Sequence, residues 1–545
     1  MAPYEKPTDD VAQHQEVVHQ VENDPSTSLA AVAAAKGQTT TGYESMTVWE
    51  TIKAFKICCL VCFAAAFSAA TDGYQIALIG NIVANPGFVE QFGTIRDGNG
   101  KVALDSPILS AWASVGNVGQ IIGMVSLPFL SGQLGRKAAM YALWFVLAIS
   151  VAVECVAREW QTWLGAKLLG GVGVGCMQTT IPTYISEVAP TRVRGTFLTC
   201  YSLWWITGQF FAPVALQVIG QYDPMNFRLP IYTQWSQIGL MLIVYLCIPE
   251  SPAWCLSMGS PERARKSLQF LYKDAPDFDI DHHCQVTLIT LEHEREVAAR
   301  LKCEKWYSIF RGVDGFRTIV SCCTLMAQMF IGMGLFFTYG SYFYQQAGMD
   351  DPFMATCITS GISILASLIV VYFSETIGRR PLATWGTTIC WACNVFVGIL
   401  GVVPQVHATH ILLVLFAVFW NIGLVANTAV GYGYIGEISS QRLRHFTAGF
   451  AAASTCVVGV GLNFLIAPMI SASEWNWGLK TCWFFAGTGA ICTAAVWLLV
   501  PETSGRSPAE LDELFERKIK PWQFRQTTTA TQDLIEESKR KTEQV

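Results

Sequence analysis

The chain is dominated by a succession of long apolar segments, each close to the length that a helix needs to cross a lipid bilayer. Such a helix requires about 20 mostly apolar residues, and the 545-residue sequence contains twelve segments of this kind. Within lipid, only helices and closed barrels satisfy every backbone polar group, and runs of this length favour helices. The sequence therefore predicts an all-α membrane protein with twelve transmembrane helices, centred near Ala65, Ile121, Leu147, Gly173, Trp205, Leu240, Gly332, Leu365, Cys393, Ala417, Val458 and Ala490.

Charged residues are scarce and unevenly placed. They make up 14% of the chain, against about a quarter in soluble proteins. The net charge of −5 gives no reason to expect a nucleic-acid partner. The distribution divides the chain into a disordered cytoplasmic tail (1–54), a six-helix bundle (55–248), a cytoplasmic loop with short helices (249–314), a second six-helix bundle (315–500) and a cytoplasmic tail (501–545).

The 18 cysteines do not follow the pattern of a disulfide scaffold or a metal site. Many lie in apolar runs such as "ICCLVCF", where a thiol behaves as a small hydrophobic group. The amino-terminal tail lacks the basic-then-apolar pattern of a cleaved signal peptide. No phosphate-binding loop or nucleophile–base pair stands out, so we expect neither a metal, nor a cofactor, nor an enzyme.

Orientation follows from the placement of Lys and Arg at the ends of the spans, because these residues are enriched in cytoplasmic connections. With the amino terminus inside, the opposite side holds only a scatter of basic residues. Both chain termini are therefore expected in the cytoplasm. The basic residues of the inside connections, apart from the central loop, are Arg136, Lys137, Arg192, Arg194, Arg379, Arg380, Arg442 and Arg444.

The two halves of the chain repeat each other at corresponding positions. "SGQLGRK" (131–137) matches "SETIGRRP" (374–381), and "YISEVAPTRVRG" (184–195) matches "YIGEISSQRLRH" (434–445). The repeat predicts inter-helix ion pairs on the cytoplasmic face, which we interpret as a gate that latches the halves together; the alternative is that the basic residues are only membrane anchors. The predicted pairs are Glu187 with Arg136 or Arg194, and Glu437 with Arg379 or Arg444.

A set of motifs in a fixed order identifies the broader relationship. "KLLGGVGVG" (167–175), "PESPAW" (249–254) and "PETSGRSPAELDELFE" (501–516), together with the repeated motifs above, resemble the sugar porter family of the major facilitator superfamily. "YFYQQAG" (342–348) and "EWNWGLKT" (474–481) are similar to its fungal branch of maltose, lactose and other disaccharide permeases. The resemblance implies two pseudo-symmetric six-helix bundles in the plasma membrane, around a cavity that opens alternately to each side.

The resemblance also implies a sugar-binding site. Proteins bind sugars through amides and hydroxyls, and through aromatic faces that cover the sugar ring. Gln209, Gln328 and Asn463 match family positions that contact sugar, Tyr432 aligns with a cavity tryptophan of the family, and Trp205 lies one turn before Gln209. The alternative role for an intramembrane amide is to hold helices together.

Other family sugar contacts are replaced in this chain. Ser202 stands where the family has a second glutamine, Met329 and Gly334 interrupt the pattern of span seven, and Thr428–Ala429 replace a Gly-Pro pair. Smaller side chains would leave room for a disaccharide or oligosaccharide. They would equally suit a carrier without ordinary hexose affinity.

The stretch "TDGYQIALIG" (71–80) places an acid inside the first span. An ionisable residue within the bilayer is costly and is a functional candidate by default. In proton-coupled members of the family an aspartate stands where this chain has Gln75, which cannot titrate, and a span-four cation, here Lys167, poises it. Asp72 is the first candidate for an acid beside Lys167, and Glu154 is the second. The alternative for Asp72 is a helix cap at the membrane edge.

Three interpretations remain open from the sequence. The first is proton-coupled sugar uptake through Asp72. The second is a facilitative uniporter, because Gln75 resembles the amide of uniporters in the family. The third is a transporter-like sugar sensor whose long tails engage cytoplasmic signalling partners. The partners expected are thus a sugar, a proton and the lipid bilayer.

Overall fold

The computed structural model of the chain describes residues 48–96, 102–275, 278–281, 283–285, 287–288, 291, 306–439, 443–471, 474–504 and 508–527. The predicted disorder of the amino-terminal tail and the signalling partners of both tails concern segments that lie almost wholly outside these residues.

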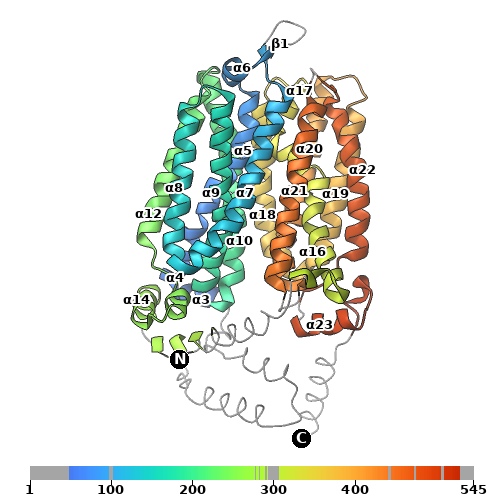
Figure 1. Ribbon diagram of the computed structural model, residues 1–545. Coiled ribbons are helices and arrows are strands. Elements are labelled where there is room, and N and C mark those ends of the chain that lie inside the picture. The colour runs from blue at the N-terminus through green and yellow to red at the C-terminus, as the bar shows by residue number, and fades with distance from the viewer. Residues whose placement is uncertain are drawn as a thin grey trace.

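The amino-terminal half is a bundle of long helices that run between the two ends of the molecule (Figure 1). A short helix, α3 (Val48–Ala54), leads into it. Two further short elements lie at the opposite end: helix α6 (Pro86–Phe92) and the antiparallel pair β1 (Ile95–Arg96) and β2 (Val102–Ala103). The bundle consists of α4 (Lys56–Ala66), α5 (Ser68–Asn81) with η1 (Ile82–Ala84), α7 (Ser106–Leu134), α8 (Arg136–Val156), α9 (Trp160–Val188), α10 (Thr191–Tyr222), α11 (Arg228–Tyr232) and α12 (Gln234–Cys247).

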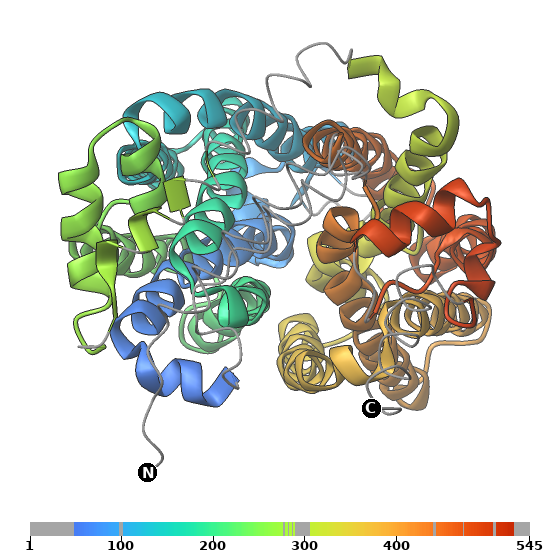
Figure 2. The ribbon, with the colours of Figure 1, turned by 90° about the horizontal axis from the view of Figure 1, so that it is seen from below.

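The carboxy-terminal half is a second bundle beside the first (Figures 1 and 2). The short helices α13 (Pro252–Ser257) and α14 (Pro261–Leu271) lie between the halves in the sequence. The second bundle consists of η2 (Trp306–Phe310), α16 (Gly312–Phe330), the π-helical segment η3 (Gly334–Thr338), α17 (Gly340–Gln346), α18 (Pro352–Ile377), α19 (Arg379–Leu400), α20 (His407–Ile438), α21 (Arg444–Ile470), η4 (Gly478–Lys480) and α22 (Thr481–Leu499), followed by α23 (Pro508–Glu516) and η5 (Pro521–Gln523).

The helices agree with the predicted spans in position. Among the residues that the structure describes, nine helical segments are long and apolar enough to cross a membrane. The other three predicted spans fall on α9, on α11 with α12, and on α16 with η3 and α17. Of these, α12 has 14 residues, and α16 carries Asp314 and Arg317. For these three the crossing itself stays a prediction.

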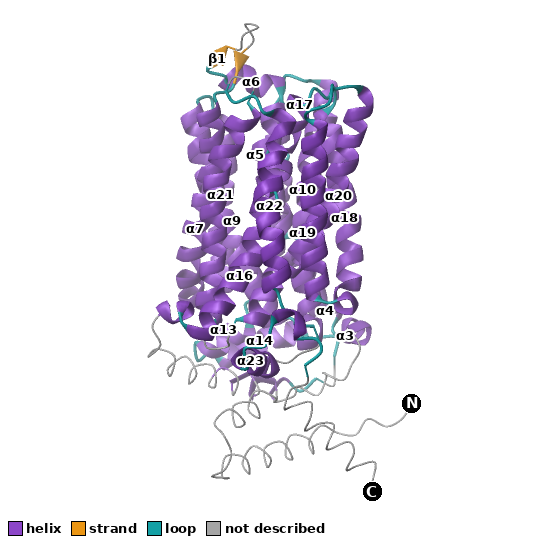
Figure 3. Cartoon of the chain, turned by 90° about the vertical axis from the view of Figure 1, so that its right-hand side faces the viewer, coloured by secondary structure: helices purple, strands orange, loops and turns teal. Residues whose placement is uncertain are grey.

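Among the described residues, the halves share an extended apolar cluster at one end and smaller contacts near the middle. A single apolar cluster takes in Phe88 and Trp112 of the first half together with Phe343 and Trp420 of the second. At this end, where α6 and α17 lie (Figure 3), the Ser341 amide donates a hydrogen bond of 3.1 Å to Asn81 Oδ1. At the α14–α23 end, the described apolar side chains form separate clusters, and none of these clusters takes in side chains of both halves. We call these the joined end and the divided end.

One glycine shows how closely the halves approach. A Cβ on Gly80 of α5 would lie 1.2 Å from the carbonyl oxygen of Thr338 in η3, so no other residue fits without moving a backbone. Helices in membranes commonly pack through small residues of this kind, because these residues let two backbones come together. The contact places η3 against the first span.

Candidate functional site

An aromatic pair joins the two halves near the middle of the bundles. Trp205 of α10 stacks on Phe337 of η3, with ring centroids 6.3 Å apart and planes inclined by 17°. Flat aromatic faces in a transport path can cover the apolar face of a sugar ring. The predicted residue Trp205 therefore lies where the two bundles meet.

Two of the predicted amides are buried with unused hydrogen-bonding groups. Gln209, one turn after Trp205, is 3% exposed. Neither Nε2 nor Oε1 of its side chain has a hydrogen-bond partner among the described residues. Gln328 of α16 is also buried, and its Nε2 lacks a partner in the same part of the chain. Buried polar groups are nearly always paired in native proteins, so these atoms are suited to a polar ligand.

Asn463 of α21 makes a contact between the halves. Its Nδ2 donates to the backbone oxygen of Ala113 in α7, at 3.4 Å. Its Oδ1 is 3.3 Å from the position that a Cβ on Gly334 of η3 would take. Asn463 thus holds helices together, as the alternative reading of the amides expected, and it also lies beside η3. Tyr432 belongs to α20, but its side chain is outside the described part of the structure.

Asp72 lies in the interior of α5. The helix begins at Ser68 after Phe67, so the alternative of a cap at the membrane edge is wrong. The side chain is 0% exposed, and its Oδ2 accepts a hydrogen bond of 3.0 Å from Gln178 Nε2 of α9. Tyr201 and Trp205 of α10 also face the carboxylate. Its Oδ1 accepts no hydrogen bond from the described residues.

Lys167 has a different acidic partner from the one that we ranked first. Its Nζ lies 2.8 Å from Glu154 Oε1 of α8, and the two side chains are 1% and 0% exposed. The expectation that Asp72 partners Lys167 is therefore wrong in this structure, and the second candidate, Glu154, is the partner. Sequence spacing could not decide between them, because the rotation of each helix determines which acid faces the lysine.

The ion pair continues into a chain of amides. Gln234 Nε2 of α12 donates to Glu154 Oε2 at 3.1 Å, and Gln75 Nε2 donates to Gln234 Oε1 at 2.5 Å. Gln75 is thus linked to the charged pair through one intermediate side chain. Lys167 also lies over the ring of Trp163, 4.6 Å from its centroid.

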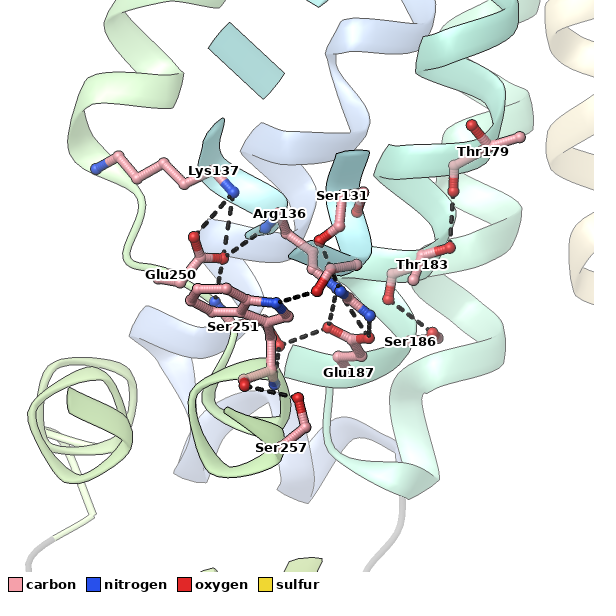
Figure 4. A network of polar contacts seen from close by, with 12 residues as sticks. Ser131, Arg136, Lys137, Thr179, Thr183, Ser186, Glu187, Glu250, Ser251 and Ser257 are labelled. Carbon is pink, nitrogen blue, oxygen red and sulfur yellow. Dashed lines mark hydrogen bonds and ion pairs between the residues drawn. The ribbon is translucent and has the colours of Figure 1, made fainter. Parts of the chain in front are cut away.

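The predicted ion pair of the first half is present at the divided end (Figure 4). The Arg136 guanidinium lies 2.6 Å from Glu187 Oε1, so the structure selects Arg136 over Arg194. Ser251 Oγ donates to Glu187 Oε2 at 2.5 Å. All three residues belong to the first half or to the segment directly after it, so this pair does not connect one half to the other. The interpretation of the pair as a latch between the halves stays a prediction, because this structure shows only its contacts within the first half.

A second acid in each half was missed by the sequence reasoning. Glu250 Oε1 accepts from the Arg136 amide at 3.0 Å, and Glu502 Oε1 accepts from the Arg379 amide at 2.9 Å. Each carboxylate therefore caps the start of a helix, α8 or α19. The preceding Gly135 and Gly378 have φ of 107° and 94°, which favours glycine. The shared "PES" and "PET" after the last span of each half was the available signal.

The remaining predicted gate residues are less completely seen. The side chains of Glu437 and Arg444 lie outside the described residues, so their predicted pairs with Arg379 and with each other stay predictions. Within the described part of the chain, no group of three or more His, Cys, Asp or Glu side chains could hold a metal ion.

The arrangement defines a class of protein. Two repeated helical bundles meet at buried amides and stacked rings, and are joined at one end and divided at the other, as in membrane carriers that bind a solute between two halves. Over residues 61–515 the chain matches the family described as "Sugar (and other) transporter". The chain belongs to this family: it is a multi-pass sugar porter of the major facilitator superfamily, and not an enzyme.

Its relatives include fungal transporters. It is 28% identical over 502 residues to a general alpha-glucoside permease of Saccharomyces cerevisiae, covering 89% of this chain and 79% of the permease. It is 26% identical to the MFS transporter fmqE of Aspergillus fumigatus, covering 88% and 92% of the two chains. It is 27% identical to the maltose permease MAL31 of S. cerevisiae, covering 84% and 75%.

Solved structures share the fold. A partially occluded, inward-open form of the xylose transporter XylE from E. coli matches with a TM-score of 0.66 and 19% identity, over 83% of this chain and all of XylE (100%). XylE described as a proton:xylose symporter, bound to 6-bromo-6-deoxy-D-glucose, also has a TM-score of 0.66, with 20% identity and coverage of 84% and 99%. These matches confirm the predicted major facilitator fold.

Proposed function

We propose that the protein takes up a sugar of disaccharide or oligosaccharide size by alternating access. The observation that carries the proposal is the Gln209 amide, which has no hydrogen-bond partner among the described residues and lies beside the Trp205–Phe337 stack, where the two halves meet. Sugar hydroxyls can both donate to and accept from such an amide, while the rings cover an apolar sugar face. Gln328, Asn463 and Tyr432 are the further proposed contacts.

The size of the proposed substrate follows from two lines of support. Ser202, Met329 and Thr428 are smaller or less polar than the amides and aromatic side chains typical of the family's sugar contacts. Two of the relatives are named for maltose and alpha-glucosides, which are larger than a hexose. Both favour a sugar of the maltose, lactose or cellobiose class.

We further propose that uptake is coupled to protons. The first support is the presence of two buried carboxylates, Asp72 and Glu154, in the first bundle. The second is that XylE, which shares the fold, is described as a proton:xylose symporter. A facilitative uniporter is the second candidate. It is favoured by Gln75, which cannot titrate and is hydrogen-bonded to the neutral Gln234.

The proposed setting is the plasma membrane, with both termini and the 249–314 segment in the cytoplasm. The divided end, which carries α13, α14 and α23, would then open to the cytoplasm, and the joined end would face outward. A sugar sensor that signals through its tails is the remaining alternative, and its evidence would have to come from segments outside the described residues.

The test is uptake of labelled maltose, cellobiose, lactose and glucose in yeast cells that lack their own sugar transporters. Accumulation of a disaccharide that a protonophore abolishes would support coupled uptake. Initial rates that the protonophore leaves unchanged, with no accumulation, would favour the uniporter. Sugar-dependent gene induction without flux would favour the sensor. No uptake of and no affinity for any carbohydrate would contradict the proposal altogether.

A further inference from the structure

We propose that Glu154 of α8 is the group that binds and releases the coupled proton, and that Lys167 of α9 holds it in place. This inference rests on the proposed function, since it assumes proton-coupled sugar uptake. Glu154 was the second candidate from the sequence for the acid beside Lys167, and it lies on a different helix from Asp72.

The first step is the complete burial of a charged pair. Glu154 and Lys167 are 0% and 1% exposed and 2.8 Å apart. Two buried charges are tolerated when they neutralise each other and their remaining groups are hydrogen-bonded, and losing one partner leaves the other strongly destabilised. Protonation of Glu154 would therefore free Lys167 from its only close anion among the described residues. A single proton thus changes which conformation the first bundle prefers.

The second step concerns the groups around Glu154. Lys167 of α9 is the cation in contact with it. The Tyr74 phenol of α5 lies nearby, but its hydroxyl is hydrogen-bonded to the Pro230 carbonyl and to Thr233 Oγ1. Cys155 is its neighbour in α8, and Arg228 of α11 faces Cys155. Arg228 Nη2 donates to Gln91 Oε1 at 3.4 Å, so this guanidinium is turned toward α6. Lys167 therefore dominates the charge environment of Glu154.

The third step is a barrier of rings beside the pair at the joined end. The rings of Phe88, Phe92, Trp112, Trp163 and Phe227 contact one another, with centroids between 4.6 and 6.5 Å apart. One of them, Trp163, is the ring that Lys167 lies over. All five rings belong to the first half, and Trp163 connects them to Lys167. A movement of this ring cluster that displaces Trp163 would therefore also change the surroundings of the Lys167–Glu154 pair.

In each transport cycle, the one proton that binds from outside is released to the cytoplasm, together with one sugar. When the joined end opens, a proton from outside adds to the Glu154 carboxylate, and the neutral acid keeps its hydrogen bond with Gln234. Sugar binds between the halves and the joined end closes. When the divided end opens to the cytoplasm, sugar leaves, Glu154 releases its proton to that side, and the ion pair with Lys167 forms again. The described structure, with the pair intact and the joined end closed, fits the last of these states.

Asp72 has surroundings that suit this role less well. The side chains that face it, Gln178, Tyr201 and Trp205, are all neutral donors. No cation forms an ion pair with it among the described residues. Protonation of Asp72 would therefore break no ion pair between helices and would leave no buried cation without its partner.

The experiment compares two isosteric variants, Glu154→Gln and Asp72→Asn, in the full-length protein. Glu154→Gln should carry sugar in counterflow at a measurable rate, yet its inside-to-outside sugar ratio should fall to unity, and sugar-dependent alkalinisation of the medium should disappear. Asp72→Asn tests the rival carboxylate and should keep sugar-dependent alkalinisation. Glu262→Gln, at an exposed position on α14, is the control and should keep both accumulation and alkalinisation. The opposite pattern, or a Glu154→Gln variant that accumulates sugar like the wild type, would overturn the inference.

A second variant covers the case in which Glu154→Gln is inactive in every assay. Gln75 is joined to Glu154 through Gln234, and its Oε1 is 3.6 Å from the position of a Cβ on Gly170, one turn from Lys167. Gln75→Asp combined with Glu154→Gln moves the carboxylate to α5 and should restore accumulation. Failure to restore it in protein that reaches the membrane would overturn the inference.

The failure of the proposed function would look different. It would appear already in the wild type, as transport without protonophore-sensitive accumulation, or as no transport. If the wild type is coupled and Glu154→Gln remains coupled, only the assignment of the proton to Glu154 fails.

Discussion

Arg136 and Glu187 form an ion pair of 2.6 Å that lies wholly within the first bundle. The pair joins the start of α8 to the end of α9, and its partners Ser131 and Ser251 belong to the same bundle or to the segment directly after it. In this structure the pair therefore ties together the divided ends of helices within one half.

The first prediction follows from this location. Glu187→Gln should lower the melting temperature of the purified protein, because Arg136 is left with a neutral partner in a half-buried site; the loss corresponds to about 2 kcal/mol for hydrogen bonds to a charged group. Cross-linking between the divided ends of the two halves should be unchanged. If the variant instead shifts the cross-linking pattern at unchanged stability, the pair acts between the halves after all.

Glu250 and Glu502 occupy equivalent positions in the two halves, and each should stabilise its helix start. Replacing either by Gln removes a charged acceptor from backbone amides at the positive end of a helix, a loss of about 1 kcal/mol. The measurement is thermal unfolding of the purified variants in detergent. Glu90→Gln is the control, because Glu90 is exposed on α6 and lies outside the first turn of that helix. Equal melting temperatures for all three variants would contradict the capping role.

Gly80→Ala should abolish transport. A Cβ there would lie 1.2 Å from the Thr338 carbonyl oxygen, so the joined end could not close as it does here. The variant should therefore expose the joined end to labelling from outside the cell. Gly220→Ala is the control, since nothing lies within 4 Å of its added Cβ. Normal uptake by Gly80→Ala would mean that the halves need not approach this closely during transport.

Gln209→Ala and Asn463→Ala should both raise the apparent KM for sugar. A lost hydrogen bond of about 1 kcal/mol corresponds to about a fivefold change. The effect should be larger for Gln209, whose two amide atoms are unpaired in the described structure, than for Asn463, which already bonds Ala113. Gln217→Ala, two turns further along α10, is the control. Wild-type kinetics in both variants would mean that these amides only hold helices together.

The sequence was informative wherever a rule depends on position along the chain. The spans, the internal repeat and the Arg136–Glu187 pair followed from apolar length and from matched motifs. It was also enough to show that Lys167 needs an acid. The choice of Glu154 over Asp72 depends on how α5, α8 and α9 are rotated about their axes, and hydropathy does not determine that rotation.

Other parts of the site depend on contacts between distant segments. The Gln75–Gln234 bond joins residues 159 positions apart, and no motif connected them. The stacking of Trp205 on Phe337 depends on the π-helical turn of η3, which directs that ring toward α10. Glu250 and Glu502 could have been found by extending the repeat comparison beyond the last span of each half.

The last prediction concerns orientation and uses thiol chemistry after the last span of the first half. Burial and the nearby Glu250 carboxylate raise the pKa of the Cys255 thiol to about 11, and the side chain is 1% exposed. Because the thiolate is the reactive form, Cys255 should stay almost unreactive toward a maleimide at neutral pH.

A new thiol in Glu262→Cys, combined with Cys247→Ser, should be exposed and react with the pH dependence of an ordinary thiol, rising through about pH 8.5. An impermeant maleimide should label it in inside-out vesicles and not in intact cells. Labelling in intact cells would place α14 outside the cell and reverse the proposed orientation of the whole molecule.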